Sequence, residues 1–167
     1  KMIETDDMVI FYTNYLSNFH KCKFMENGLI FNCTEQYFMY YKARTFSHGH
    51  TSNKNIADKI LLSSDPFEIK RLGREVTHYD DAVWSNTRYT LMLRGNLLKY
   101  SQNHDILIKL LSTGNKTLVE ASPTDKIWGV GLAEKDPLIL DSKNWQGQNL
   151  LGKCLMDARA TLLDKFV

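Results

Sequence analysis

Helical spacing of apolar residues runs through most of this chain, and this periodicity limits the possible fold more than any other feature. Near the end, Leu151, Leu155 and Leu162 recur at the positions that one face of a helix requires. Asp65-Pro66 combines a capping residue with a proline at the first helical position, which marks another helix start. The segments expected to be helical are 34 to either 44 or 46, 53–63, 65–71, 81–100, 105–112 and 148–166.

Patterns that favour strands are short. Residues 8–12 (MVIFY) and 117–121 (TLVEA) are rich in β-forming residues. Asn27-Gly28 separates two alternating segments, 21–25 and 29–33, which is a strong signal for a β-hairpin. Thr34 follows and is expected to cap the first helix. Together these patterns predict an α+β fold, with about six helices around a small, mainly antiparallel sheet.

The composition is that of one folded domain. The chain has 167 residues, 43% of them hydrophobic and 24% charged, and single domains usually contain about 100–200 residues. Its three prolines do not lie in a Pro/Gly/Ser-rich linker, so we expect one domain over residues 1–167. Aromatic residues make up 11% of the chain. Because buried Tyr and Trp need a hydrogen-bond partner, some are expected to line a surface or a pocket.

Charge and cysteine content narrow the class of protein. The formal net charge is only +2, so an overall excess of positive charge cannot account for any binding of nucleic acid. Three widely spaced cysteines predict neither a zinc site nor a disulfide framework, and they favour a reducing compartment. No apolar run is long enough to span a membrane, and no signal-peptide core is present. We expect a soluble protein of the cytoplasm, or of the nucleus in a eukaryote, without a metal or cofactor.

The most informative segment for function is residues 31–44, FNCTEQYFMYYKAR. Glu35 lies at the start of a predicted helix, and Lys42 follows about two turns later, so both side chains share one face. The helix dipole favours an anion in the first turn. The alternative interpretation is an acid that only complements the dipole.

A second polar segment follows the predicted strand at 117–121. It contains Asp125, Trp128, Gly129 and Gly131. The glycines would let the backbone approach a ligand closely, and the tryptophan could stack on a flat ring. The alternative is a tight turn with a core tryptophan. Gly-Val-Gly alone is too short for a dinucleotide fingerprint.

Three weaker signals remain. Gly147 precedes the last predicted helix, whose N–H groups could bind an anion, although simple capping is the alternative. Asn18 either contacts a ligand or closes its own turn. The polar segment 47–53 (SHGHTSN) is predicted to be a loop beside the site that Glu35 and Lys42 would form. This loop either shapes access for a large substrate or has no role in binding.

In their order along the chain, these segments resemble the NADAR family, also called YbiA-like. The matching motifs are Leu16–Phe19, Glu35–Phe38 followed by Lys42, Leu72–Arg74, Trp84, residues 118–121, Asp125 with Trp128-Gly129, and Asn149–Gly152. The resemblance implies a compact, mainly helical α+β domain with its core at residues 8–160. It also implies a metal-independent N-glycosidase activity.

The resemblance also implies which residues of this chain form the site. The family's key acid corresponds to Glu35 and its second acid to Asp125, and these two are the predicted catalytic residues. The residues predicted to bind substrate are Asn18, Lys42, Arg74, Trp84, Trp128, Gly129 and Asn149. Lys42 and Arg74 would bind phosphate or pyrophosphate. Trp84 and Trp128 would stack on the two sides of a sugar or a base.

Three functions are open on this basis. The first is hydrolytic removal of ADP-ribose from ADP-ribosylated guanine in DNA or RNA. The second is an N-glycosidase for phosphorylated ribosylamino-pyrimidine intermediates of riboflavin synthesis. The third is a non-catalytic module that binds ADP-ribose or NAD, which the presence of Glu35, Lys42, Trp84 and Asp125 disfavours. The expected partners are thus ADP-ribose, ADP-ribosylated nucleic acid or a small ribosyl phosphate, and no membrane.

Overall fold

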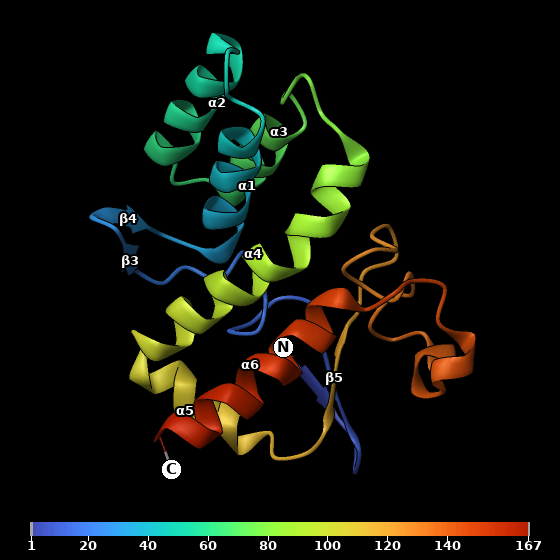
Figure 1. The fold of residues 1–167 in the computed structure, drawn as a ribbon. Helices are drawn as coiled ribbons and strands as arrows, with labels where there is room; N and C mark the ends of the chain where they lie inside the picture. The colour runs from blue at the N-terminus through green and yellow to red at the C-terminus, as the bar shows by residue number, and fades with distance from the viewer. Residues whose placement is uncertain (1, 167) are drawn as a thin grey trace. The chain divides into compact units, whose positions relative to one another are not determined.

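The computed structural model describes residues 2–166, which contain six α-helices, two short 3-10 helices and five strands (Figure 1). The chain divides into two compact units. We call residues Lys1–His20 with His104–Val167 the terminal unit, and residues Lys21–Asn103 the central unit. The predicted α+β class is confirmed. That the whole chain acts as one domain stays a prediction.

The central unit consists of four helices and a β-hairpin. Strands β3 (Phe24–Glu26) and β4 (Leu29–Phe31) pair antiparallel. Asn27 and Gly28 have φ values of 50° and 80°, the left-handed backbone that a two-residue hairpin turn requires, so the predicted hairpin is confirmed. The helices are α1 (Thr34–Thr45), α2 (Thr51–Leu62), α3 (Pro66–Gly73) and α4 (Asp81–Ser101). Helix α1 packs against the other three helices of the unit.

Two local expectations for this unit are wrong. Thr34 is not the cap of α1, because Cys33 occupies that position without a side-chain hydrogen bond. The loop expected over 47–53 ends early, since α2 begins at Thr51. Asn53 is buried there, and its amide donates to the carbonyls of Phe46 and Thr77, both at 2.7 Å. These bonds hold the start of α2 in place, so the role of Asn53 is structural.

An aromatic cluster forms the core of the central unit around Phe24, Phe31 and Tyr37. The hydroxyl groups of Tyr37 and Tyr41 donate to the same carboxylate oxygen of Glu26, at 3.0 and 2.8 Å. These bonds supply the partners that buried tyrosines need. Part of the aromatic excess therefore serves packing.

The terminal unit is built on a three-stranded sheet in the order β1-β2-β5. Strand β1 (Met2–Glu4), which the sequence patterns did not predict, pairs antiparallel with β2 (Met8–Phe11). Strand β2 pairs in parallel with β5 (Thr117–Glu120), so the sheet is mixed rather than wholly antiparallel. Parallel neighbours need a long crossover connection, and here the chain between β2 and β5 includes the entire central unit.

Helices α5 (His104–Ser112) and α6 (Leu150–Phe166) complete the terminal unit, with the short helices η1 (Pro137–Leu140) and η2 (Ser142–Asn144). Helix α6 packs against β5. At Gly152 an added Cβ atom would collide with the Leu118 carbonyl oxygen, so glycine permits this close approach. Trp145 packs on the core of this unit and donates from its indole N–H to the Ile139 carbonyl at 2.8 Å.

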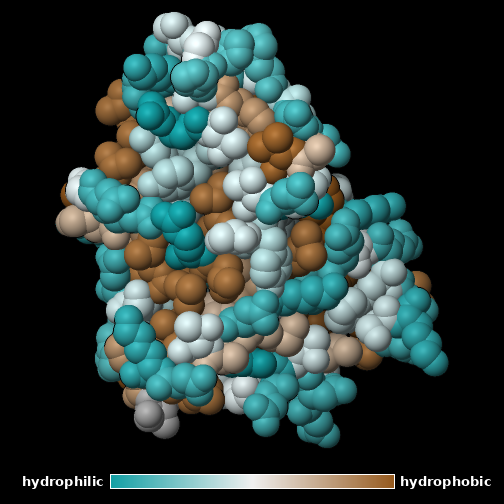
Figure 2. All heavy atoms as spheres, in the orientation of Figure 1, coloured by the Kyte–Doolittle hydropathy of each residue, from teal (hydrophilic) through white to brown (hydrophobic). Residues whose placement is uncertain are grey.

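The surface of the central unit carries both polar and apolar side chains. Figure 2 shows polar and apolar atoms interspersed around the helices of the central unit. Exposed apolar side chains there include Leu62 and Phe67. Within residues 2–166, no helix combines the length and the apolar character that crossing a membrane requires.

Candidate functional site

Glu35 is the second residue of α1 and is only 7% exposed. The first-turn position predicted from the sequence is therefore confirmed. Unpaired N–H groups at a helix start give that end a partial positive charge, which stabilises a carboxylate. A buried carboxyl group next to this positive potential is suited to stabilise a developing cation.

Lys42 lies two turns further along α1 and is half-buried. Its Nζ donates to the Gly73 carbonyl at 3.0 Å and lies 5.4 Å from the centre of the Tyr79 ring. Burial lowers the pKa of Lys42, with a further lowering from Arg74, while the negative charge of Glu35 raises it. Glu35 and Arg74 are thus close enough to Lys42 for their charges to act on it, and we call these three residues of the central unit the charged cluster.

The C-terminus of α3 brings two members of this cluster together. Arg74 is the exposed C-cap residue of α3, directly after the Gly73 carbonyl that holds Lys42. An added Cβ on Gly73 would collide with the side chain of Met39 on α1. Glycine therefore allows α3 to dock closely enough for its last carbonyl to reach Lys42. Sequence reasoning missed this carbonyl, although the Leu-Gly-Arg motif contains it.

Trp84 is placed differently from what a stacking platform requires. Its indole is 5% exposed, with the ring of Phe38 at 5.0 Å and that of Phe46 at 6.3 Å between centres. Aromatic neighbours therefore cover most of its surface. In the free protein Trp84 can offer an edge to a substrate but not a full face.

In the terminal unit, Asp125 organises a turn. One of its carboxylate oxygens accepts from the backbone N–H groups of Ile127 and Trp128, at 3.0 and 2.9 Å. This holds the half-buried Trp128 in a fixed position. Within residues 2–166 the second oxygen, Oδ2, makes no hydrogen bond, so it is available to a ligand hydroxyl.

The start of α6 is not an anion site. The carbonyl groups of residues 126–129 accept hydrogen bonds from the amides of residues 148–151, at 2.8–3.1 Å. The loop therefore occupies the amides that an anion would need. Of the two interpretations that the sequence left open, capping is correct.

Gly129 and Asn149 hold this loop on the sheet. A Cβ on Gly129 would lie 2.9 Å from both the Asp125 carbonyl oxygen and the Ser122 Cβ, so the chain itself takes up the space that was expected for a ligand. The buried Asn149 amide donates to the Leu118 carbonyl and accepts from the Glu120 N–H, both at 3.0 Å. These contacts give both residues a structural role, and the expectation that they bind substrate stays a prediction.

Asn18 is 9% exposed, and its Oδ1 is buried without a hydrogen-bond partner within residues 2–166. Asn14 and Ser17 close this turn instead, by accepting from the N–H groups of Leu16 and Phe19 at 2.8 and 3.1 Å. Because a buried acceptor without a partner is costly, this finding favours the ligand-contact interpretation of Asn18.

Comparison with known proteins identifies the family. A family model described as the NADAR domain matches residues 10–163, most of the chain. This chain belongs to the NADAR family. The match extends over parts of both units. Within residues 2–166 there is no group of three or more His, Cys, Asp or Glu side chains that could hold a metal ion.

Several relatives carry names that concern function. N-glycosidase R617 of Acanthamoeba polyphaga mimivirus is 43% identical over 125 residues, covering 75% of this chain and 71% of that protein. The protein irg-1 of Caenorhabditis elegans is 40% identical, with 89% and 68% covered. Among solved structures, the NMR structure of YbiA from E. coli matches with a TM-score of 0.76 at 24% identity, covering 98% of this chain and 89% of that one. This last likeness shows the fold.

Proposed function

We propose that this NADAR protein is an N-glycosidase that removes ADP-ribose from ADP-ribosylated guanine in nucleic acid. The charged cluster of Glu35, Lys42 and Arg74 carries the proposal, because Glu35 is buried at the start of α1 and its charge, like that of Arg74, acts on Lys42. Relatives named N-glycosidases, from a mimivirus and from Nostoc punctiforme, support the reaction class.

The chemistry of the bond assigns the role of Glu35. When the bond between the anomeric carbon and the base nitrogen breaks, its electron pair leaves with the base and positive charge develops on the sugar ring. A carboxylate close to that carbon stabilises the charge, or removes a proton from the water that attacks it. The base takes up a proton as it leaves. Burial of Glu35 strengthens its interaction with the developing cation.

Other residues of the central unit fit further parts of an ADP-ribosyl group. Lys42 and Arg74 supply two positive charges for the pyrophosphate, since a forked guanidinium matches phosphate oxygens well. Trp84 contacts a flat ring of the substrate with the exposed edge of its indole. For Asn18, Asp125 and Trp128 in the terminal unit, contact with a substrate stays a prediction of the family resemblance.

A second candidate substrate is a phosphorylated ribosylamino-pyrimidine. Its support comes from two relatives with names in riboflavin biosynthesis. The maize chloroplast protein PYRR is 32% identical over 132 residues, which make up 19% of that longer protein. The Vibrio vulnificus protein VVA0006 is 28% identical over 148 residues. Both candidate reactions cleave an N-glycosidic bond, so the two proposed functions differ only in the substrate.

A substrate comparison with matched variants tests the proposal. Wild type, Glu35→Gln and Glu68→Gln would each receive ADP-ribosylated guanine DNA and the ribosylamine phosphate, and mass spectrometry would follow sugar release. Glu68 is an exposed acid in the first turn of α3, so its variant makes the same chemical change away from the cluster. We expect Glu35→Gln to lose about 100- to 1000-fold in rate and Glu68→Gln to keep it.

Each outcome has a defined meaning. Cleavage of the DNA substrate supports the proposal, and cleavage of only the ribosylamine phosphate replaces it by the second candidate. Retained ADP-ribose affinity without any cleavage identifies a binding module and refutes both. Near wild-type rates for a folded Glu35→Gln protein show that another residue is the catalytic carboxylate.

A further inference from the structure

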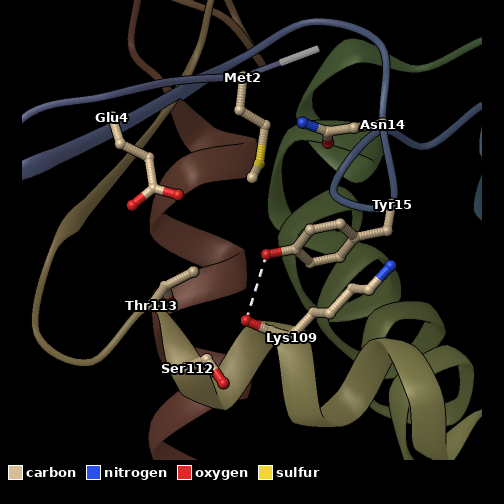
Figure 3. A pocket seen from close by; sticks show the side chains of 7 residues that line it. All are labelled: Met2, Glu4, Asn14, Tyr15, Lys109, Ser112 and Thr113. Atoms are coloured by element: carbon tan, nitrogen blue, oxygen red, sulfur yellow. Dashed lines mark hydrogen bonds between the residues drawn. The ribbon is translucent and has the colours of Figure 1, made fainter.

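A pocket of about 430 Å³ lies in the terminal unit and contains none of the candidate site residues. Figure 3 shows its walls, which come from β1, from the turn after β2 and from the end of α5. The residues that line it are Met2, Glu4, Asn14, Tyr15, Lys109, Ser112 and Thr113.

The Asn14 amide offers an unused donor at this pocket. Its Oδ1 accepts from the Leu16 N–H at 2.8 Å, which fixes the orientation of the amide. Its Nδ2 is buried and has no acceptor within residues 2–166. A buried donor without an acceptor is costly, and a ligand oxygen would remove that cost.

Two positively charged side chains, Arg159 and Lys109, lie at the same pocket. Arg159 is 9% exposed, and its Nη1 donates to Oγ1 of the pocket residue Thr113 at 2.8 Å. Lys109 Nζ lies 5.8 Å from the centre of the Tyr15 ring. Within residues 2–166 neither cation has a carboxylate within ion-pair distance. Among the described residues that line the pocket, Glu4 is the only one with a carboxylate, and it pairs with Lys116 at 3.3 Å.

Tyr15 adds a neutral polar group next to these charges. Its hydroxyl donates to the Lys109 carbonyl at 3.2 Å, the dashed line in Figure 3. Burial and the negative charge of Glu4 raise its pKa to about 12, against an opposing effect of Arg159, so it stays protonated. The ring of Tyr15 and the side chain of Met2 provide an apolar surface beside the polar groups.

We propose that this pocket binds a small organic anion, whose carboxylate or phosphate oxygens bond to Asn14 and whose apolar body packs on Met2 and Tyr15. The cations Arg159 and Lys109 provide the attraction. The site is separate from the loop that carries Asp125 and Trp128. Arg159 follows Leu150, the first residue of α6, by nine residues, which corresponds to about 14 Å along the helix. The inference does not depend on the proposed function.

NMR titration of the whole protein tests this site. The probes are benzoate and phenyl phosphate, which share an apolar ring and differ in the anion. Saturable shifts are expected at the Asn14 side-chain amide and the Arg159 Nε–H, and not at the Trp128 indole. In Asn14→Asp the Leu16 N–H bond is kept, but the donor becomes a negative acceptor, so we expect at least about tenfold weaker binding.

The control variant is Asn115→Asp, which adds the same charge at an exposed position outside the pocket wall and should change the affinity little. If only one probe saturates, its anionic group, carboxylate or phosphate, is the one that the pocket binds. The proposal is refuted if neither probe saturates by about 10 mM, if Trp128 shifts instead, or if both variants bind equally. Should Asn14→Asp not fold, Lys109→Gln provides the same comparison, with weaker binding expected.

Discussion

Lys99 is the most deeply buried charge in the described chain, with no exposed surface. Burial lowers its pKa from 10.5 to about 8, although the nearby thiols of Cys22 and Cys33 raise it. The folded protein therefore holds this proton less tightly than the unfolded chain does. Below pH 8 the buried ammonium reduces stability, and this cost disappears as the pH rises from about 8 towards 10.5.

Replacing Lys99 by methionine should remove this pH dependence. We expect the unfolding free energy of the wild type to increase relative to that of Lys99→Met between about pH 7 and pH 10, by up to about 3 kcal/mol. Urea unfolding of both proteins at the two pH values measures this difference. Taking the difference cancels the titration of tyrosines and cysteines common to both proteins. A constant difference would show that Lys99 keeps its ordinary pKa in the fold.

Single side chains also set the chemistry of the site. The pKa of Lys42 is lowered by burial, yet Glu35 favours its charged form. Asn18 keeps a buried acceptor without a partner within residues 2–166. Such costs persist in a fold when a ligand offsets them, which is why these positions support the substrate-binding proposal.

At the scale of elements, α4 packs on α1 through a glycine. A Cβ on Gly95 would lie 2.8 Å from the Tyr37 ring and 3.4 Å from the Thr34 methyl group. The glycine lies within one uninterrupted helix, where it permits close packing. The sequence alone shows only a residue that weakens helices.

Gly95→Ala tests this packing role. Alanine favours a helix by about 1 kcal/mol over glycine, but here its methyl group must displace a buried aromatic ring, which typically costs about 1–3 kcal/mol. We expect net destabilisation, or no gain. Thermal unfolding compares it with Ser85→Ala on the exposed face of the same helix. Stabilisation by Gly95→Ala would contradict the tight contact.

Asn149 joins β5 to the start of α6, and the variant Asn149→Asp separates its two hydrogen bonds. The bond from the Glu120 N–H is kept, but a carboxylate then faces the Leu118 carbonyl. We expect a loss of about 1–3 kcal/mol in unfolding free energy. Denaturant unfolding measures the loss, and an unchanged midpoint would show that Asn149 does not hold the loop.

At the scale of the whole molecule, the net charge of +2 leaves any contact with nucleic acid to local clusters such as Lys42 and Arg74. If the substrate is a modified oligonucleotide, its KM should rise steeply between about 50 and 200 mM salt, because bound counterions are released from the phosphates. ADP-ribosylated guanosine as a control substrate should show a much smaller change. Equal salt dependence for the two would remove nucleic acid from the proposal.

The sequence predicted those elements whose signals are local. The Asn27-Gly28 hairpin, the Asp65-Pro66 helix start and Glu35 in the first turn of α1 all follow from backbone preferences of neighbouring residues. Strand β1 lacked such a signal, because a three-residue strand forms only when β2 is present to pair with it. The parallel pairing of β2 with β5 likewise joins segments that no local pattern connects.

Sequence alone therefore determined the α+β class, the positions of the helices and the family motifs that single out Glu35 and Lys42. Only the tertiary structure decided what the other candidate residues contact. In the fold, Lys42 donates to the Gly73 carbonyl and aromatic rings cover Trp84. The amides at the start of α6 donate to the carbonyl groups of a loop. The physical reason is that a hydrogen bond or a buried contact depends on which distant groups the fold brings within a few ångströms.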